Sequence, residues 1–188
     1  MPKPLGHAAG IAHDSRAGPY SLPVRFRVST TIAAPRDLVE EAFVDPAFYA
    51  ELGDLPNIRA PEVLSMDADA DVVRLRIHYA LQADLSPAVR RVLDPEKITW
   101  IEESTVHRRR HYTDFRMVPE HYVNRMECAG SYRFEESGPD TTEQVVEGDL
   151  VIHYPVVGRL VERAILTGMR QHLAEEARLL ERWAQQRG

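Results

Sequence analysis

The chain has 188 residues, of which 44% are hydrophobic and 28% are charged, as is typical of a soluble globular protein. We expect one domain, because domains commonly hold about 100 to 200 residues. The 29 acidic and 23 basic side chains give a net charge of −6. This charge repels phosphate backbones and anionic lipid surfaces, so we expect no nucleic-acid partner.

Three further features predict a cytoplasmic protein. No run approaches the roughly 18 to 20 apolar residues of a membrane span, so we expect no stable membrane insertion. Cys128 is the only cysteine, which excludes an internal disulfide bond and suits a reducing compartment. Residues 1–21 have neither the apolar core of a secretory signal nor any periodicity. We predict a flexible tail over 1–21 and a domain over 22–186.

The first elements are a strand and two short helices. Alternation of apolar and polar residues over 24–32 predicts a half-buried strand. Pro35 is expected at the first position of a helix. A second short helix is expected after Asp45 and Pro46, where the aspartate can cap the helix and the proline can lead it.

The middle of the chain predicts a run of strands. They are expected over 61–65, 73–81, 97–106, 109–118, 122–135 and 143–154, with a helical turn over 85–93. Gly138-Pro139-Asp140 marks a hairpin turn. The basic run Arg108-Arg109-Arg110 is interpreted as a solvated strand end in preference to a phosphate-binding patch. Hairpin-length connections favour an antiparallel sheet.

The last segment changes to a helical period. An amphipathic helix is predicted over 156–186, about 45 Å long at 1.5 Å per residue. One side of this helix is expected to lie on the sheet. That side holds Val157, Val161, Ala164, Ile165, Gly168, Met169, Leu179, Leu180 and Trp183.

This order of elements, with Ala33-Ala34-Pro35 after the first strand and Asp45-Pro46 at the second helix, resembles the START-like superfamily (SRPBCC, polyketide cyclase and lipid-transfer proteins). The segments 153–162 (HYPVVGRLVE) and 85–92 (LSPAVRRV) look like the family called domain of unknown function 2505. The resemblance implies an α+β helix-grip fold. In that fold a curved antiparallel sheet of about six to seven strands wraps around a long C-terminal helix and leaves an elongated cavity for apolar ligands.

Alternation along the strands and the helical period select the candidate ligand-binding residues, which are expected to face that cavity. They are Tyr79, Trp100, Phe115, Tyr132, Ile152, Tyr154, Ile165, Gly168, Met169 and His172. The alternative is that all of them are ordinary core. The tyrosines are the better candidates for ligand contact, because a buried tyrosine hydroxyl must find a hydrogen-bond partner.

His172 and Glu176 interrupt the apolar stripe of the terminal helix. They are four residues apart, so they can hydrogen-bond each other. Gly168 lies one turn earlier and costs the helix about 1 kcal/mol relative to alanine, which makes sense where space is needed. Two interpretations stay open: His172 is a polar contact inside the cavity, or the pair lies half solvated at the rim of the sheet.

No metal or cofactor site is expected. His107 and His111 share a strand face only if one strand continues through the arginines, and the other histidines lack a spacing that selects a metal. The sequence also has no glycine-rich phosphate loop and no nucleophile elbow.

Three functions remain. Binding or transport of a hydrophobic small molecule or lipid is favoured, because apolar burial suffices for it. A polyketide cyclase- or aromatase-like enzyme is the alternative, in which residues such as His172, Glu176 and the tyrosines move protons; no catalytic residue is assigned. The third is an interaction module or homodimer, with Leu166, Leu173 and Ala177 on the far side of the terminal helix as its contact.

Overall fold

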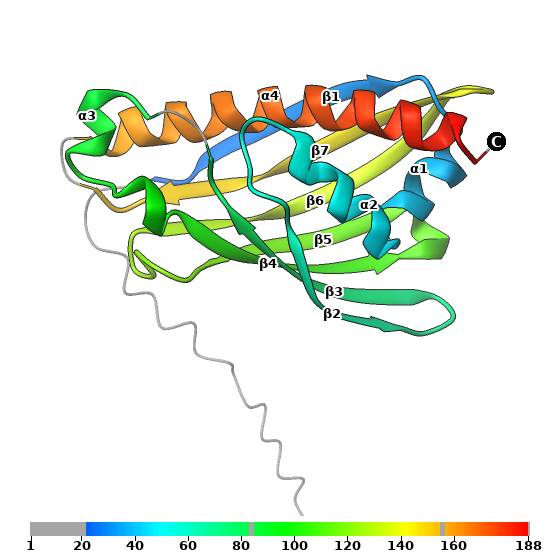
Figure 1. Ribbon diagram of the computed structural model, residues 1–188, viewed down its shortest axis with the longest axis horizontal. Helices are drawn as coiled ribbons and strands as arrows, with labels where there is room; N and C mark the ends of the chain where they lie inside the picture. The colour runs from blue at the N-terminus through cyan, green and yellow to red at the C-terminus, as the bar shows by residue number, and fades with distance from the viewer. Residues whose placement is uncertain (1–21, 83–84, 155–156, 188) are drawn as a thin grey trace, which may run out of the picture.

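The computed structural model describes residues 22–82, 85–154 and 157–187, and shows a seven-stranded antiparallel sheet that curves around one long helix (Figure 1). The predicted tail over 1–21 lies outside the described residues. The strands are β1 (Val24–Ile32), β2 (Glu62–Ala68), β3 (Val72–Ala80), β4 (Thr99–His107), β5 (Tyr112–Pro119), β6 (Met126–Gly138) and β7 (Thr141–Ile152). The helices are α1 (Arg36–Ala42), α2 (Pro46–Glu51), α3 (Pro87–Arg90) and α4 (Gly158–Gln185), with 3-10 turns η1 (Leu52–Asp54), η2 (Pro95–Lys97) and η3 (Arg108–Arg110).

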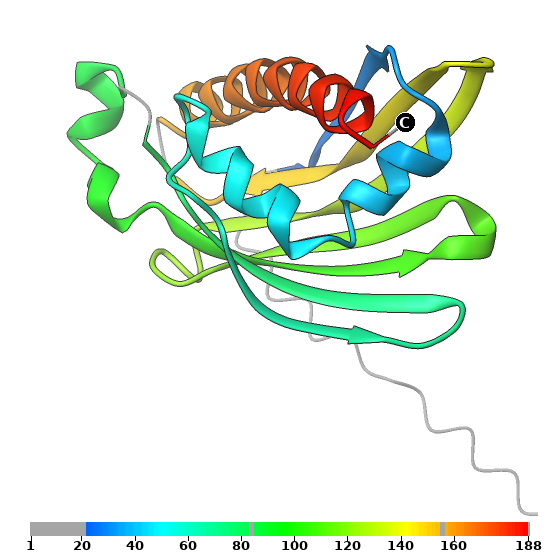
Figure 2. The ribbon, with the colours of Figure 1, turned by 45° about the vertical axis from the view of Figure 1, so that its right-hand side comes forward.

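The sheet order is β1-β7-β6-β5-β4-β3-β2. Each strand from β2 to β7 lies beside its neighbour in sequence, and β1 is the edge strand that pairs with β7. Figure 2 shows α1 and α2 on the same side of the sheet as α4. This is the predicted helix-grip architecture, with seven strands and two short helices after the first strand, and the prediction is confirmed.

Opposed glycines allow the long strands β6 and β7 to bend. Gly130 pairs with Gly148, and a Cβ atom added to either one would collide with the backbone of the other strand. At Gly148 it would also lie 2.9 Å from the Phe26 ring. A side chain at either position would therefore push the strands or the ring of β1 away from this contact.

The starts of the two short helices follow their local sequence. The carboxylate of Asp45 accepts a hydrogen bond from the backbone N–H of Ala47 at 2.9 Å, and Pro46 opens α2, as predicted. Helix α1 begins at Arg36, one residue later than expected, because Pro35 keeps an extended backbone with ψ of 142° and serves as the N-cap.

The expected strand over 109–118 begins too early. The chain turns at η3 and enters β5 only at Tyr112, with His111 in the left-handed conformation at φ 51°. The arginines of η3 are exposed, and Arg109 pairs with Asp71 at 2.6 Å. As a result His107 and His111 do not share a strand: His107 lies 3.2 Å from Asp114, and His111 lies 2.9 Å from Glu40.

The expected strand over 122–135 begins later. Tyr122 has a φ of 58°, so the chain is still turning there and β6 starts at Met126. The remaining strand boundaries agree with the expectation within about three residues. The hairpin turn expected at Gly138 to Asp140 connects β6 and β7.

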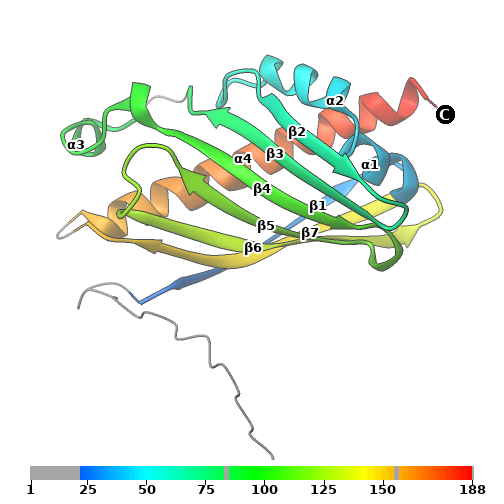
Figure 3. The same cartoon turned by 90° about the horizontal axis from the view of Figure 1, so that it is seen from below.

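Helix α4 covers 28 residues, Gly158 to Gln185, and crosses the concave face of the sheet (Figure 3). The expected start at Val156 lies outside the described residues. Two expectations about its faces are wrong. Ala164 is exposed, whereas Leu173 and Ala177, expected on the far side, are 4% and 3% exposed. The later turns of α4 are covered from two sides, by the sheet and by α1 and α2, so their buried face is wider than one stripe.

The interior divides into two core clusters. The first packs α1, α2 and the C-terminal turns of α4 on β3, and holds Phe48 and Trp183 with ring centroids 5.5 Å apart. The second lies under α3 and the N-terminal turns of α4, around Phe115 and Leu150. In the first, 19 fully buried hydrophobic residues accompany eight partly buried ones, whereas the second has 11 and 12. The second cluster is therefore the less completely covered.

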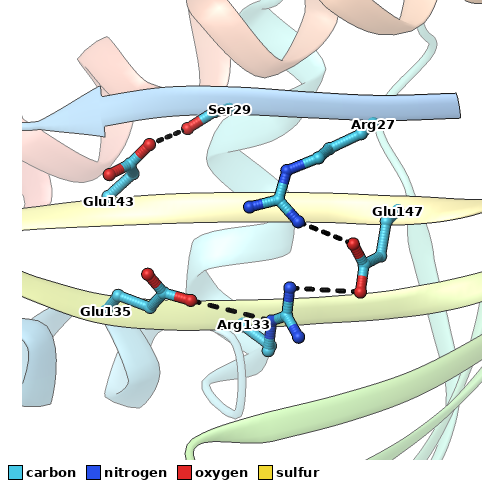
Figure 4. Close-up of polar contacts among 6 residues, drawn as sticks. All are labelled: Arg27, Ser29, Arg133, Glu135, Glu143 and Glu147. Atoms are coloured by element: carbon cyan, nitrogen blue, oxygen red, sulfur yellow. Dashed lines mark hydrogen bonds and ion pairs between the residues drawn. The ribbon is translucent and has the colours of Figure 1, made fainter.

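The convex face of the sheet carries cross-strand ion pairs. Glu147 on β7 accepts from Arg27 of β1 at 2.7 Å and pairs with Arg133 of β6 at 3.1 Å (Figure 4). Ser29 donates to Glu143 on the same face. These exposed pairs solvate the outer surface, and each is worth about 1 kcal/mol or less.

Candidate functional site

The concave face brings several of the predicted residues together. Tyr79 and Trp100 are register partners on β3 and β4, and their rings stack with centroids 5.4 Å apart. Phe115 of β5 and Tyr132 of β6 lie 4.6 Å apart. Tyr132 packs against both core clusters, so it lies where they meet.

The other predicted residues lie along the second core cluster. Ile165 and Met169 of α4 are partly buried against it, and Ile152 is 2% exposed within it. Tyr154 is also partly buried there, but it lies after the end of β7 with the guanidinium of Arg125 5.2 Å from its ring centroid. It is not part of the aromatic group formed by Tyr79, Trp100, Phe115 and Tyr132.

Gly168 faces unfilled space. A Cβ atom added to it would meet no atom within 4 Å. The residue lies in the middle of α4, where a glycine weakens the helix by about 1 kcal/mol relative to alanine. Packing against a neighbour therefore does not explain its missing side chain.

Glu102 is a buried carboxylate that the sequence analysis missed. It is 8% exposed in the middle of β4, and its two oxygens accept hydrogen bonds from Ser104 Oγ at 2.8 Å and from Tyr132 Oη at 3.2 Å. Burial raises the pKa of Glu102, and the two hydrogen bonds offset only part of that effect. The alternation along the strand could have predicted its position, because Glu102 and Ser104 share the face already assigned to Trp100.

Glu176 is the second buried carboxylate. Gln144 Nε2 of β7 donates to its Oε1 at 3.0 Å, and His172 Nε2 lies 3.5 Å from its Oε2. The contact between His172 and Glu176 is the one predicted from their spacing. The Glu176 side chain is 7% exposed and that of His172 is 21% exposed, so Glu176 is buried and His172 is partly buried.

We call these groups the polar belt; it crosses the concave interior from β4 to α4. It consists of Glu102, Ser104, Tyr132, Gln144, His172 and Glu176. Its charged members interact electrostatically. The negative charge of Glu176 raises the pKa of Glu102 further, and His172 lowers it. The belt is thus one electrostatic unit in a mainly apolar interior.

The phenols around the belt are held neutral. Burial, and after it the charge of Glu102, keeps the pKa values of Tyr79 and Tyr132 well above the ordinary range. The same two causes act on Tyr49 of α2. These hydroxyls therefore act near neutral pH as hydrogen-bond donors and acceptors and not as phenolates.

Three buried atoms on or beside the belt lack a hydrogen-bond partner among the described residues. They are Trp100 Nε1, Gln144 Oε1 and His172 Nδ1. Buried polar atoms are nearly always paired in native proteins, with protein, water or a ligand. These three atoms, which come from β4, β7 and α4, are therefore left to pair with water or with a ligand.

The hollows on the described part of the molecule include the following two. One of about 450 Å³ lies on the β2–β5 part of the sheet, lined by charged side chains that include Arg76, Glu103 and Arg116. The other, about 290 Å³, lies between α1 and the β4–β5 turn. Neither is lined by a residue of α4. An enclosed cavity between α4 and the sheet stays a prediction.

Among residues 22–82, 85–154 and 157–187, no group of three or more His, Cys, Asp and Glu side chains converges as a metal ion requires. In the same part of the chain no helix is long and apolar enough to cross a membrane.

A family model described as protein of unknown function (DUF2505) matches residues 27–184. No curated protein matches the sequence. The match to the family model agrees with the resemblance seen in segments 85–92 and 153–162.

Solved structures share the fold at low sequence identity. The TTHA0849 protein of Thermus thermophilus is 16% identical with a TM-score of 0.64, over 88% of this chain and 99% of that chain. Zhui aromatase/cyclase from a Streptomyces species is 18% identical with a TM-score of 0.60, over 86% and 94%. Truncated norcoclaurine synthase from Thalictrum flavum is 14% identical with a TM-score of 0.58, over 84% and 92%. At these identities the similarity concerns the fold alone.

Proposed function

The chain belongs to the DUF2505 family, and we propose that it binds or transports a hydrophobic small molecule or lipid between α4 and the concave face of the sheet. The observation that carries the proposal is the polar belt with its three unpaired buried atoms. A pocket for an organic ligand is mostly apolar and contains a few convergent polar groups. The interior around the belt has that composition.

The second core cluster supplies the apolar surface. Its partly buried side chains are Leu85, Val92, Ile98, Met117, Tyr122, Met126, Tyr132, Tyr154, Val157, Ile165, Leu166 and Met169. A ligand that covers them is stabilised by about 25 cal/mol per Å² of apolar surface removed from water. The proposed ligand therefore lies against the N-terminal half of α4 and extends its polar end to the belt.

Binding of the neutral fluorescent probe N-phenyl-1-naphthylamine tests this proposal. We expect saturable binding that Ile165→Arg abolishes, because the change puts a charge where the apolar end of the ligand would lie. Leu64→Arg is the matched control, since Leu64 is 43% exposed on the edge strand β2. Native mass spectrometry of freshly purified protein should also detect a co-purifying apolar molecule. Absence of saturable probe binding would refute the proposal.

A second function, a polyketide cyclase- or aromatase-like enzyme, is favoured by one observation. Glu102 has a raised pKa and contacts the Tyr132 hydroxyl, which are properties of a general acid–base group in an apolar site. If the protein is such an enzyme, Glu102→Gln should abolish turnover of a poly-β-ketone substrate and leave its binding intact. Turnover no faster than in buffer would remove this function and leave the binding proposal standing.

A cytoplasmic location and a homodimer also stay proposals. Cys128 is buried, and burial raises its pKa to about 12, so this thiol is inert and suits any compartment. The buried positions of Leu173 and Ala177 remove the surface first considered for a dimer.

A further inference from the structure

One end of the molecule gathers segments that lie far apart in the sequence. Figures 1 and 3 show α3, the β5–β6 turn and the start of α4 at this end. Hydrogen bonds join the segments. The backbone N–H of Asp94, after α3, donates to Tyr122 Oη at 2.9 Å, and that of His153, after β7, donates to the Arg125 carbonyl oxygen at 2.8 Å. We call this surface the basic end; it consists of residues 85–93, 121–126 and 158–163.

The basic end differs in charge from the chain as a whole. Residues 85–93 and 121–126 contain three arginines and no acidic residue. The N-terminal part of α4, 158–174, contains three more arginines and one acid, Glu162, which is 8% exposed. The acids that flank these segments are paired within the protein, as Asp94–Lys97, Glu120–His78 and Glu127–His153. The net charge of −6 therefore hides a local excess of positive charge.

Two of these arginines lie where a helix does not favour them. Arg159 and Arg163 occupy the first two turns of α4, and the first turn has no acidic residue. The macrodipole of a helix favours acidic side chains near its N-terminus and disfavours cations there. Both arginines are exposed, and Arg163 Nε donates to the Arg159 carbonyl oxygen at 3.2 Å, which does not neutralise its charge. Helix stability therefore does not explain these two residues.

Exposed apolar side chains accompany the arginines. Val123 of the β5–β6 turn is 59% exposed and Leu160 of α4 is 36% exposed. Leu22 is 88% exposed at the same end, because β1 begins beside the end of β7. Among the described residues, the other exposed large hydrophobic side chain is Leu64 on the edge strand β2. Exposed apolar groups that gather at one place mark a contact surface for a protein or a membrane.

The two kinds of side chain together select the partner. The headgroups of an anionic bilayer offer phosphate groups to arginines, and the acyl chains below them accept protruding apolar side chains such as Val123 and Leu160. We propose that the basic end docks the protein reversibly on an anionic lipid surface. This contact is peripheral, and it does not depend on what the protein binds between α4 and the sheet.

Flotation of the full chain with lipid vesicles tests the proposal. One vesicle preparation is phosphatidylcholine alone, and the other contains about one third phosphatidylglycerol. We expect binding to the anionic vesicles to be at least about tenfold tighter than to the neutral ones, because each arginine near an anionic surface contributes a factor of about five. Binding should be largely lost in about 1 M salt, which screens exposed charges.

A matched pair of charge reversals locates the contact. Arg159→Glu combined with Arg163→Glu should weaken binding to the anionic vesicles at least about twentyfold, since both charges face the headgroups. Arg178→Glu combined with Arg182→Glu is the control. These exposed arginines have the same spacing in the C-terminal part of α4, and the double change alters the net charge equally. The control should weaken binding less than about threefold, because charges farther from the surface than about 10 Å are screened.

The apolar contact is tested separately. Leu160→Ser combined with Val123→Ser should weaken binding to the anionic vesicles about tenfold, because less apolar surface leaves water on docking. Leu64→Ser is the control and should leave vesicle binding unchanged. Circular dichroism checks that each variant is folded. If one is not, the wild-type comparison of the two vesicle preparations and the salt dependence decide the question.

The other outcomes would overturn the proposal. Wild-type protein that does not float with the anionic vesicles would refute it, as would equal binding to both preparations or equal losses for the two charge reversals. Binding to polyglutamate in place of vesicles would refute it too and assign the basic end to an acidic protein segment. None of these results bears on binding of N-phenyl-1-naphthylamine, so the two proposals fail separately.

Discussion

The two core clusters are built from the same sheet and the same helix, yet they are covered differently. At the first, α1 and α2 close over the C-terminal turns of α4, and Phe48 and Trp183 are almost completely buried. At the second, α3 and short turns are what accompanies the N-terminal turns among the described residues, and Ile165 and Met169 are partly buried. The polar belt lies at the boundary, since its member Tyr132 packs on both clusters.

This difference separates stability from recognition. Close packing of the first cluster secures α4 on the sheet. Incomplete coverage of the second leaves apolar surface that an additional molecule can cover, and it does so next to unpaired polar atoms. The comparison therefore predicts that substitutions at the first cluster change the free energy of unfolding, whereas those at the second change ligand affinity.

The largest expected effect is the loss of Trp183. Trp183→Ala should lower the free energy of unfolding by about 3–5 kcal/mol, because the side chain is 2% exposed and its removal leaves a cavity beside Phe48. Met169→Ala, at the partly buried position, should cost less than about 2 kcal/mol. Urea denaturation followed by circular dichroism measures both. Equal losses would contradict the proposed difference between the clusters.

A pH-dependent effect is expected next, at Glu102. Since the pKa of Glu102 is raised in the folded state, the protonated form of Glu102 stabilises the fold. This stabilisation is lost as pH rises above the unfolded pKa of about 4 and Glu102 ionises. Glu102→Gln cannot ionise. Its stability relative to wild type should therefore increase from pH 4 to pH 8, measured by urea denaturation at each pH.

The same sign of pH dependence is expected for His172 in a higher pH window, because its pKa is also raised in the folded state, and this provides a second test. Its raised pKa stabilises the fold below the unfolded pKa of about 6.5, and this stabilisation is lost as pH rises through the folded pKa. His172→Gln should thus be most destabilising at acidic pH. A pH-independent difference for both variants would show that neither group is shifted in the folded protein.

The fold could be predicted further than the site. Alternation in β1 and β3 and the caps at Asp45 and Pro46 are local signals, and the structure confirms them. The faces of α4 at Ala164, Leu173 and Ala177 were mispredicted. Ala177 is buried in the first cluster and Leu173 in the second, so burial along α4 depends on which elements cover each turn, which a helical period does not contain.

The polar belt shows a similar limit. His172 and Glu176 were found because residues that are four positions apart on one helix lie side by side. Glu102, Tyr132 and Gln144 come from three different strands, and their meeting depends on sheet register. A glutamate within a strand is also typical of a solvated face, so parity with Trp100 was the only local signal for Glu102.

A smaller effect is expected at Gly168. Gly168→Ala should raise the free energy of unfolding by about 1 kcal/mol, because alanine favours the helix and the added methyl group meets no atom within 4 Å. If the ligand occupies that space, the same change should weaken probe binding. Thr167→Ala, at the exposed neighbouring position, is the control and should leave binding unchanged. A more stable variant with unaltered affinity would place the ligand away from Gly168.

The smallest effect is expected on the convex face, which takes no part in the comparison between the clusters. Arg133 is 36% exposed and pairs with Glu147, so Arg133→Ala should cost about 1 kcal/mol or less and lose most of that effect in 1 M salt, where exposed charges are screened. Ligand affinity should not change, because the side chain lies on the opposite face of β6 from Tyr132. A loss of probe binding in this variant, with the stability unchanged, would move the recognition surface from the concave interior to the outer face of the sheet.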